Sequence, residues 1–143
     1  MEIVMANAKL TPYIISEDAR AQAEFYVQAL GGEIVSVVTQ GQALGEEASE
    51  AHKDKVLHLS IVAAGVPFFF TDSVMEPSVP GNSLNLSLEF PTEEDAHAAF
   101  AKLSEGGKVN HPLERAFWGA LFGQLEDKFG VLWMITNEVK PAQ

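Results

Sequence analysis

The segments GVPFFFT at residues 65–71 and GVLWMIT at residues 130–136 align without a gap when the chain is shifted by 65 residues. A shift of 75 residues aligns AQAEF at 21–25 with AHAAF at 96–100 and extends to the Gly-Gly pair that follows each of them. Two matches in the same order predict an internal duplication. The first copy has ten residues more than the second between these matches, and we place them in the polar, acidic stretch 41–55 as a long exposed loop.

Each copy contains one predicted helix. Ser16 can cap a helix that runs to Leu30, with acidic residues in its first turn, where they stabilise the positive end of the helix dipole. The second helix begins at Thr92, with Asp95 three residues later in an arrangement like a capping box. Both end at a Gly-Gly pair, which is typical of a helix C-terminus.

Most of the remaining sequence is predicted to be extended. The segment LNLSLEF at 84–90 alternates strictly, so its apolar residues share one face of a strand and its polar residues share the other. The predicted strands are 10–15, 34–39, 56–62, 66–71, 84–90, 118–125 and 131–136, with 108–112 as a weaker one. We therefore predict an α+β fold in a single domain, 1–143, made of duplicated βαβββ modules at 8–72 and 82–137.

Composition and charge exclude several classes of function. Of 143 residues, 47% are hydrophobic and 20% are charged, as in compact rather than disordered chains. A net charge of −11 repels phosphate backbones and anionic lipid, so no nucleic-acid or membrane partner is expected. The chain has no cysteine, which excludes disulfides and thiolate chemistry. The start MEIVMANAKL lacks the pattern of a secretory signal, and the apolar run 61–70 is short of the roughly 18 residues of a membrane span, so we expect a cytoplasmic protein.

Each copy also contains further short motifs. They are PYI at 12–14, EFY at 24–26 and LGGE at 30–33 in the first, and GN at 81–82, FWG at 117–119 and DKFGVLWMI at 127–135 in the second. With the duplicated pattern, these motifs resemble the vicinal oxygen chelate superfamily of glyoxalases, bleomycin-resistance proteins and ring-cleaving dioxygenases, and in particular its PhnB-like branch. The resemblance covers almost the whole chain and implies that two modules close a curved-sheet cup.

The resemblance also implies where a metal would be held. In the metal enzymes of the superfamily, the first and fourth strands of each module supply one ligand each, and these positions map onto Thr11, Phe69, Asn85 and Met134. Divalent metals need imidazole, carboxylate or thiolate ligands, and this set contains none. A slip of two residues along a strand does not restore the site, because Tyr13 and Ser87 are poor ligands and only Glu89 could bind a metal. We therefore expect no metal and no other cofactor.

The strand faces opposite the helices would line the cup that the resemblance implies. Glu89 is the best acid/base candidate, because partial burial raises the pKa of a carboxyl, although it can equally be a solvated charge at a strand end. His58 can bind a ligand, act as a base, or be a structural histidine. We expect His58 and Glu89 to point into the same cavity. The candidate ligand-binding residues are Tyr13, His58, Asn85, Glu89, Trp118 and Met134.

Three functions remain open at this point. The first is a metal-independent PhnB-like protein that binds a small molecule. The second is a lyase, isomerase or dioxygenase of the same superfamily with a relocated metal site. Whether the chain is an enzyme therefore stays undecided. The third has no ligand, because Tyr13, Phe69, Trp118 and Met134 fill the cup. We expect a homodimer, because relatives of this fold commonly pair chains and because bare edge strands favour pairing. No nucleophile elbow, P-loop or dinucleotide fingerprint is present.

Overall fold

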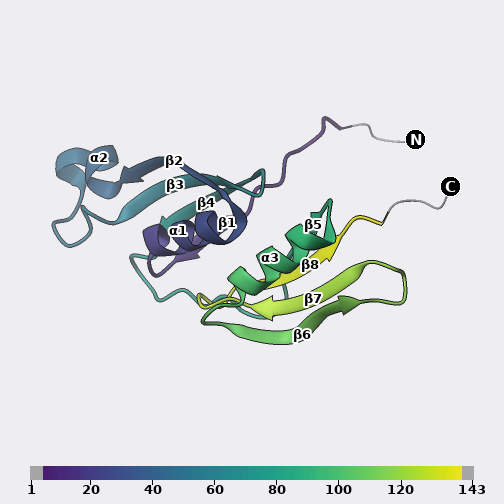
Figure 1. Ribbon diagram of the computed structural model, residues 1–143. Helices are drawn as coiled ribbons and strands as arrows, with labels where there is room; N and C mark the ends of the chain where they lie inside the picture. Colours follow the sequence, from purple (N-terminus) through teal and green to yellow (C-terminus); the bar gives the residue numbers. More distant parts are fainter. Residues whose placement is uncertain (1–4, 140–143) are drawn as a thin grey trace.

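A computed structural model describes residues 5–139 (Figure 1). The chain forms two modules with the same order of elements, apart from an insertion in the first. The first module contains β1 (Tyr13–Ser16), α1 (Ala19–Leu30), β2 (Gly32–Thr39), α2 (Gln40–Leu44), a 3₁₀ turn (Gly45–Glu47), β3 (Val56–Ala63) and β4 (Val66–Asp72). The second contains β5 (Asn85–Phe90), α3 (Glu93–Leu103), β6 (Lys108–Arg115), β7 (Leu121–Glu126) and β8 (Leu132–Asn137).

Each module has one four-stranded mixed sheet. Sheet A has the strand order β1-β4-β3-β2, and sheet B has the matching order β5-β8-β7-β6. The β1–β4 and β5–β8 pairs are parallel, and the other pairs are antiparallel. The predicted α+β fold of duplicated βαβββ modules is confirmed.

Equivalent hydrogen bonds show that the duplication extends to single side chains. The Asp72 carboxylate accepts a bond from the Val56 N–H at 2.7 Å, and the Asn137 side chain accepts one from the Leu121 N–H at 2.7 Å. Both residues of the second contact lie 65 positions after those of the first. These bonds fasten the end of β4 to the start of β3, and the end of β8 to the start of β7.

The Gly-Gly pairs have two separate structural roles. Gly31 has a φ of 77° and ends α1, which confirms the predicted stop, whereas α3 ends at Leu103 with Ser104 as its C-cap, before the second pair. Its neighbour Gly32 starts β2 so close to β3 that an added Cβ would lie 1.8 Å from the Val62 carbonyl oxygen. At the equivalent Gly107, an added Cβ would lie 2.2 Å from the Glu126 carbonyl oxygen. Close backbone contact therefore requires glycine as the second residue of each pair.

The first helix begins later than predicted, and its cap is Asp18 rather than Ser16. Asp18 is extended, with a φ of −147°, and its carboxylate accepts a bond from the Ala21 N–H at 3.1 Å. The Ser16 hydroxyl accepts from the Asp18 N–H at 3.1 Å and so stabilises the approach to the helix. The predicted acidic first turn is therefore wrong. The predicted cap at Thr92 is confirmed, because its hydroxyl accepts from the Asp95 N–H at 3.1 Å.

Strand bounds differ from the prediction where pairing begins late or continues further. The first strand starts at Tyr13 rather than at residue 10, since its register with β4 starts there. The β7 strand starts at Leu121, because 116–120 form a turn closed by a bond from the Ala116 N–H to the Ala120 carbonyl. The β6 strand extends to Arg115, beyond the predicted 108–112. The predicted loop 41–55 contains most of α2.

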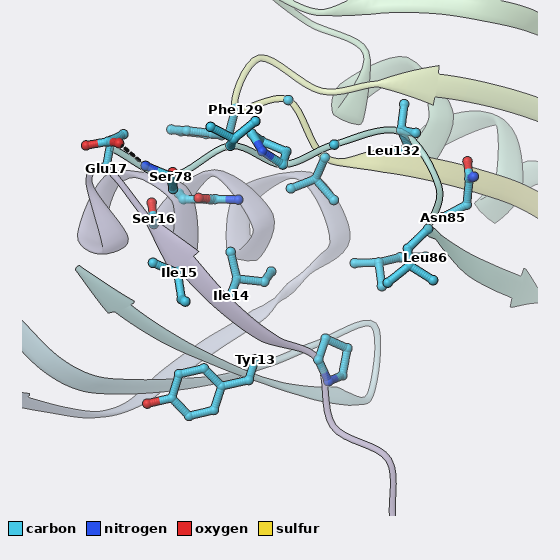
Figure 2. A pocket seen from close by; sticks show the side chains of 18 of the residues that line it. Tyr13, Ile14, Ile15, Ser16, Glu17, Ser78, Asn85, Leu86, Phe129 and Leu132 are labelled. Carbon is cyan, nitrogen blue, oxygen red and sulfur yellow. Dashed lines mark hydrogen bonds between the residues drawn. The ribbon is translucent and has the colours of Figure 1, made fainter. Parts of the chain in front are cut away.

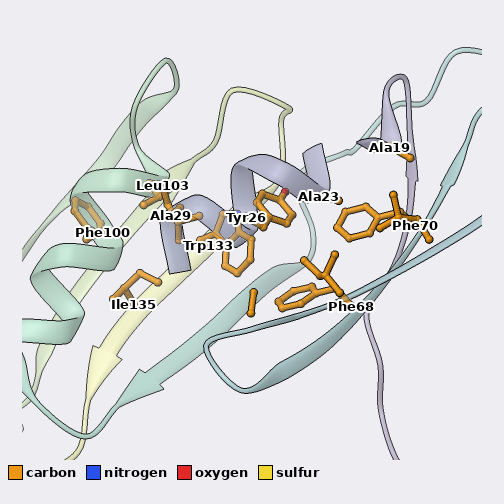
Figure 3. Packing of buried hydrophobic residues seen from close by; sticks show 14 of the residues in the cluster. Ala19, Ala23, Tyr26, Ala29, Phe68, Phe70, Phe100, Leu103, Trp133 and Ile135 are labelled. Atoms are coloured by element: carbon orange, nitrogen blue, oxygen red, sulfur yellow. The ribbon is translucent and has the colours of Figure 1, made fainter. Parts of the chain in front are cut away.

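Both long helices pack into one hydrophobic core between the sheets (Figures 1 and 3). Tyr26 of α1 lies against Trp133 of β8, with ring centroids 5.2 Å apart and planes nearly perpendicular. It also contacts Phe68 and Phe70 of β4. Since α1 and α3 contact each other, each helix covers the face of its own sheet that is turned toward the other module. The open faces of sheets A and B therefore point away from each other.

Buried Asp127 joins the two modules. Its carboxylate accepts bonds from the Tyr26 hydroxyl at 2.6 Å and the Trp133 indole N–H at 2.8 Å. It also accepts from the backbone N–H groups of Phe129 and Val131, at 2.8 and 3.0 Å. Burial, and then the charge of Asp127, raise the pKa of Tyr26 well above its usual value, so the hydroxyl stays protonated and keeps donating. Residues 127–130 form a turn that a bond from the Gly130 N–H to the Asp127 carbonyl closes, with Gly130 at a φ of 92°.

Within residues 5–139, no helix is long and apolar enough to cross a membrane. The expectation drawn from the start MEIVMANAKL rests in part on residues 1–4, which lie outside the described residues.

Candidate functional site

The open faces of the two sheets carry the residues that the strand patterns assigned to the cup. In β3, Leu59 and Ile61 are buried under α1, whereas His58 and Ser60 are half-buried on the opposite face. In β8, Trp133 and Ile135 are buried, and Met134 is half-buried on the open face. Alternation along each strand therefore identified the correct face.

A groove of about 370 Å³ on the open face of sheet B brings three predicted residues together: Glu89, Trp118 and Met134. Phe122 also lines this groove, and its ring centroid lies 5.9 Å from that of Trp118. The rest of the lining is Ser87, Ala120, Thr136, Asn137 and Val139. Of these, Thr136 could have been found from the sequence, because it lies two residues after Met134 on the same strand.

The polar groups of this groove differ in whether other parts of the chain bind them. The Thr136 hydroxyl donates to the Leu121 carbonyl at 2.7 Å, so it serves the fold. Among the described residues, the exposed Glu89 carboxylate forms no hydrogen bond or ion pair with another side chain. The groove therefore combines an aromatic wall, a thioether and a free carboxylate, which is the mixture of apolar and polar groups typical of small-molecule sites.

The open face of sheet A carries three aromatic rings. Tyr13 of β1 pairs with Phe69 of β4, and the His58 ring lies 4.9 Å from the Phe69 ring and 6.0 Å from that of Tyr13. Tyr13 is 54% exposed, so much of this surface is open to solvent. The two predicted residues Tyr13 and His58 therefore lie together, but on a different sheet from Glu89.

A larger groove of about 940 Å³ lies between the modules, and both Tyr13 and the predicted residue Asn85 line it (Figure 2). The Asn85 side-chain carbonyl accepts a bond from the Gln124 amide at 3.1 Å, so one end of its amide is held by sheet B. The linker between the modules borders the groove and is fastened by a bond from the Ser78 N–H to the Glu17 carboxylate. Because β1 and β5 are edge strands, this groove separates the free edges of the two sheets.

The expectation that His58 and Glu89 point into one cavity is wrong for a single chain. Both side chains are on open faces, as predicted, but His58 is on sheet A and Glu89 is on sheet B. The two helices lie between the sheets, so these faces cannot close over a common space within one chain. Strand alternation determines the face of a residue but not the packing of one module on the other.

The positions that would bind a metal do not fit one. Phe69 pairs with Tyr13, and Met134 pairs with Ser87, so a benzyl group and a thioether occupy the middle of the two open faces. Thr11 precedes β1, and Asn85 lies at the start of β5. Within residues 5–139, no three His, Cys, Asp or Glu side chains come together as a metal site would need.

Comparison with known proteins gives consistent matches along nearly the whole chain. The model of the family described as the Glyoxalase/Bleomycin resistance protein/Dioxygenase superfamily matches residues 8–135. Protein YjdN of Escherichia coli (strain K12) is 25% identical over 142 residues, which cover 92% of this chain and 95% of that protein.

Two solved structures are similar in both sequence and fold. Protein PA1353 from Pseudomonas aeruginosa is 30% identical, with a TM-score of 0.79 over 92% of this chain and 98% of that one. A Bacillus cereus protein, described as a putative 3-demethylubiquinone-9 3-methyltransferase and PhnB protein, is 26% identical, with a TM-score of 0.72 over 92% of this chain and 100% of that one.

Proposed function

Because the chain belongs to the Glyoxalase/Bleomycin resistance protein/Dioxygenase superfamily, we propose that it binds a small organic molecule without a resident metal ion. The observation that carries this proposal is the groove on sheet B, where Glu89, Trp118 and Met134 meet. The position that supplies a metal ligand in the superfamily's metal enzymes is occupied in this groove by the thioether of Met134. The equivalent position on sheet A is occupied by Phe69. These side chains favour binding of an organic molecule over binding of a metal ion.

We further propose that two copies of the chain complete each cup as a homodimer. The open faces of one chain point away from each other, so sheet A of one copy has to face sheet B of another if the two faces are to enclose a ligand. In that arrangement, His58 and Glu89 would share a cavity across the dimer. Exposed apolar side chains on both faces, among them Ile15 and Trp118, support this proposal, because burial of such groups stabilises association.

The free sheet edges supply a way to join the copies. The carbonyls of Pro12 and Ser16 accept bonds from β4 residues and the residue that follows β4, so the backbone groups of Tyr13 and Ile15 point to the free side of β1. In β5, the Phe90 carbonyl accepts a bond from the Glu138 N–H. By the same alternation, every second residue of β5 has its backbone N–H and carbonyl groups on the free side of the strand. We propose that β1 of one copy pairs with β5 of the other, because unpaired edges favour strand addition.

Two other functions have less support. Methyl transfer is named for the Bacillus cereus relative, but this sequence has no Rossmann glycine turn for a methyl donor. A lyase, isomerase or dioxygenase with a relocated metal site would need donors beyond His58 and Glu89. We also place the protein in the cytoplasm, a location that suits a chain without cysteine.

We predict that the neutral fluorescent probe N-phenyl-1-naphthylamine binds saturably and that Met134→Lys weakens this binding at least about tenfold, because a charge would lie in the apolar floor of the groove. The matched control is Met75→Lys, at a methionine that is 87% exposed on the linker, and it should leave binding unchanged. Dialysis against a chelator should also leave binding unchanged. Equal binding by Met134→Lys and the native chain, or no binding by either, would contradict the proposal.

A further inference from the structure

One row of cross-strand neighbours on the open face of sheet B carries two carboxylates. Glu89 of β5 pairs with Thr136 of β8, which pairs with Phe122 of β7, which pairs with Glu114 of β6. Neighbouring strands lie about 4.8 Å apart, so the Phe122 ring is one strand from Glu114 and two strands from Glu89. The row therefore places an aromatic ring between two negative charges.

Trp118 adds a second aromatic surface beside this row. It lies in the turn before β7, is 52% exposed, and meets Phe122 edge to face. Aromatic faces attract cations as well as flat rings, and tryptophan does so more strongly than the other aromatic residues. Carboxylates next to such rings are typical of sites that recognise organic cations.

No basic side chain neutralises the two carboxylates within the described part of this face, apart from a weak contact of Glu114 with a histidine. His111 Nε2 lies 3.8 Å from the Glu114 carboxylate, with side chains 45% and 66% exposed, and the His111 ring contacts that of Phe122 edge to face. Lys108 is two rows away, at about 13 Å along the strands, and is the cross-strand neighbour of Glu126. Arg115, next to Glu114 in sequence, instead binds the Glu93 side chain and the Gly119 carbonyl.

We propose that this face binds a flat aromatic organic cation, whose ring contacts Trp118 and Phe122 and whose charge lies between Glu89 and Glu114, which are three strand spacings, about 14 Å, apart. The inference rests on the proposed function and adds the chemical class of its ligand. The equivalent of Glu89 in the first module is Ile15, 74 residues earlier, so the charge belongs to sheet B and would distinguish the two walls of a cup.

The test compares 1-methylquinolinium with its neutral isostere 1-methylnaphthalene and with the anion 1-naphthoate, all in moderate salt to reduce non-specific attraction to the acidic chain. Binding is followed by the indole N–H resonances of ¹⁵N-labelled protein. The chain has two tryptophans, so Trp118→Phe assigns them, and the buried Trp133 serves as an internal reference.

We expect the cation to shift the Trp118 resonance and to bind at least about tenfold more tightly than the neutral isostere. Glu89→Gln and Glu114→Gln should each weaken the cation about three- to tenfold and leave the neutral compound unchanged, because each removes one attractive charge. Glu105→Gln, an exposed residue after α3, is the control with the same change in net charge and should have no effect.

Equal affinity for the cation and the neutral compound would overturn the inference but leave the proposed function standing. If none of the three compounds shifts the Trp118 indole resonance, the inference is overturned. The proposed function is overturned by a separate result, which is that the native chain does not bind N-phenyl-1-naphthylamine.

Discussion

Replacing Asp127 by alanine is expected to lower the free energy of unfolding by about 3–5 kcal/mol, because four buried or half-buried donors lose their acceptor. These donors are the Tyr26 hydroxyl, the Trp133 indole and the N–H groups of Phe129 and Val131. Denaturant unfolding followed by circular dichroism measures the change. The contact joins α1 to the β7–β8 turn, so we expect both modules to be affected in one transition.

Two variants control for charge and for volume. Asp127→Asn keeps one acceptor oxygen for the backbone N–H groups but turns an amide N–H₂ toward the Trp133 indole, so we expect an intermediate loss of about 1–2 kcal/mol. Glu105→Ala removes a charge at an exposed position and should change the free energy by less than about 0.5 kcal/mol. A loss below about 1 kcal/mol for Asp127→Ala would contradict the structural role of this carboxylate.

The second large effect concerns assembly. At micromolar concentration and moderate salt, the native chain should sediment at twice its 15.5 kDa mass. Ile15→Pro should raise the dissociation constant of the dimer at least about 100-fold, because proline removes a free-edge N–H and its ring obstructs the approaching strand. The β1–β4 bonds are formed by the even-numbered residues and should persist.

Ile15→Val is the matched control, because it keeps the backbone N–H and most of the apolar side chain. It should remain dimeric. A native mass of 15.5 kDa, or an unchanged dimer in Ile15→Pro with its circular dichroism intact, would show that the edge of β1 is not part of an interface.

Much of the fold could be predicted because the duplication repeats specific contacts. The 65-residue shift that aligns β4 with β8 also aligns the Asp72–Val56 bond with the Asn137–Leu121 bond. Residues that match under this shift therefore occupy equivalent places in the two modules. Alternation gave His58 and Met134 their correct faces. The helix start was wrong because Ser16 and Asp18 are both good caps, and the extended backbone of Asp18, not the residue types, decides between them.

The arrangement of the candidate site could not be predicted from strand patterns. Tyr26 and Asp127 are 101 residues apart, and each has an ordinary local interpretation, one in an amphipathic helix and the other in a turn. Their bond joins α1 to the β7–β8 turn of the second module, and the packing of the helices between the sheets separates His58 from Glu89. Local periodicity carries no information about such a contact. The row from Glu89 to Glu114 likewise depends on the irregular register of β6, which pairs Glu114 with Phe122.

The central claim is that two chains complete one cup, and mixing two inactive variants tests it most directly. Phe69→Lys places a charge on the open face of sheet A, and Met134→Lys places one at the equivalent position on sheet B. Each variant alone should bind N-phenyl-1-naphthylamine at least about tenfold more weakly than the native chain does. When both chains are co-expressed, half of the dimers should be mixed and should hold one intact cup each, so we expect about a quarter of the native binding capacity to return. A mixture that binds no more probe than the separate variants, or a Phe69→Lys variant that binds as the native chain does, would contradict the account.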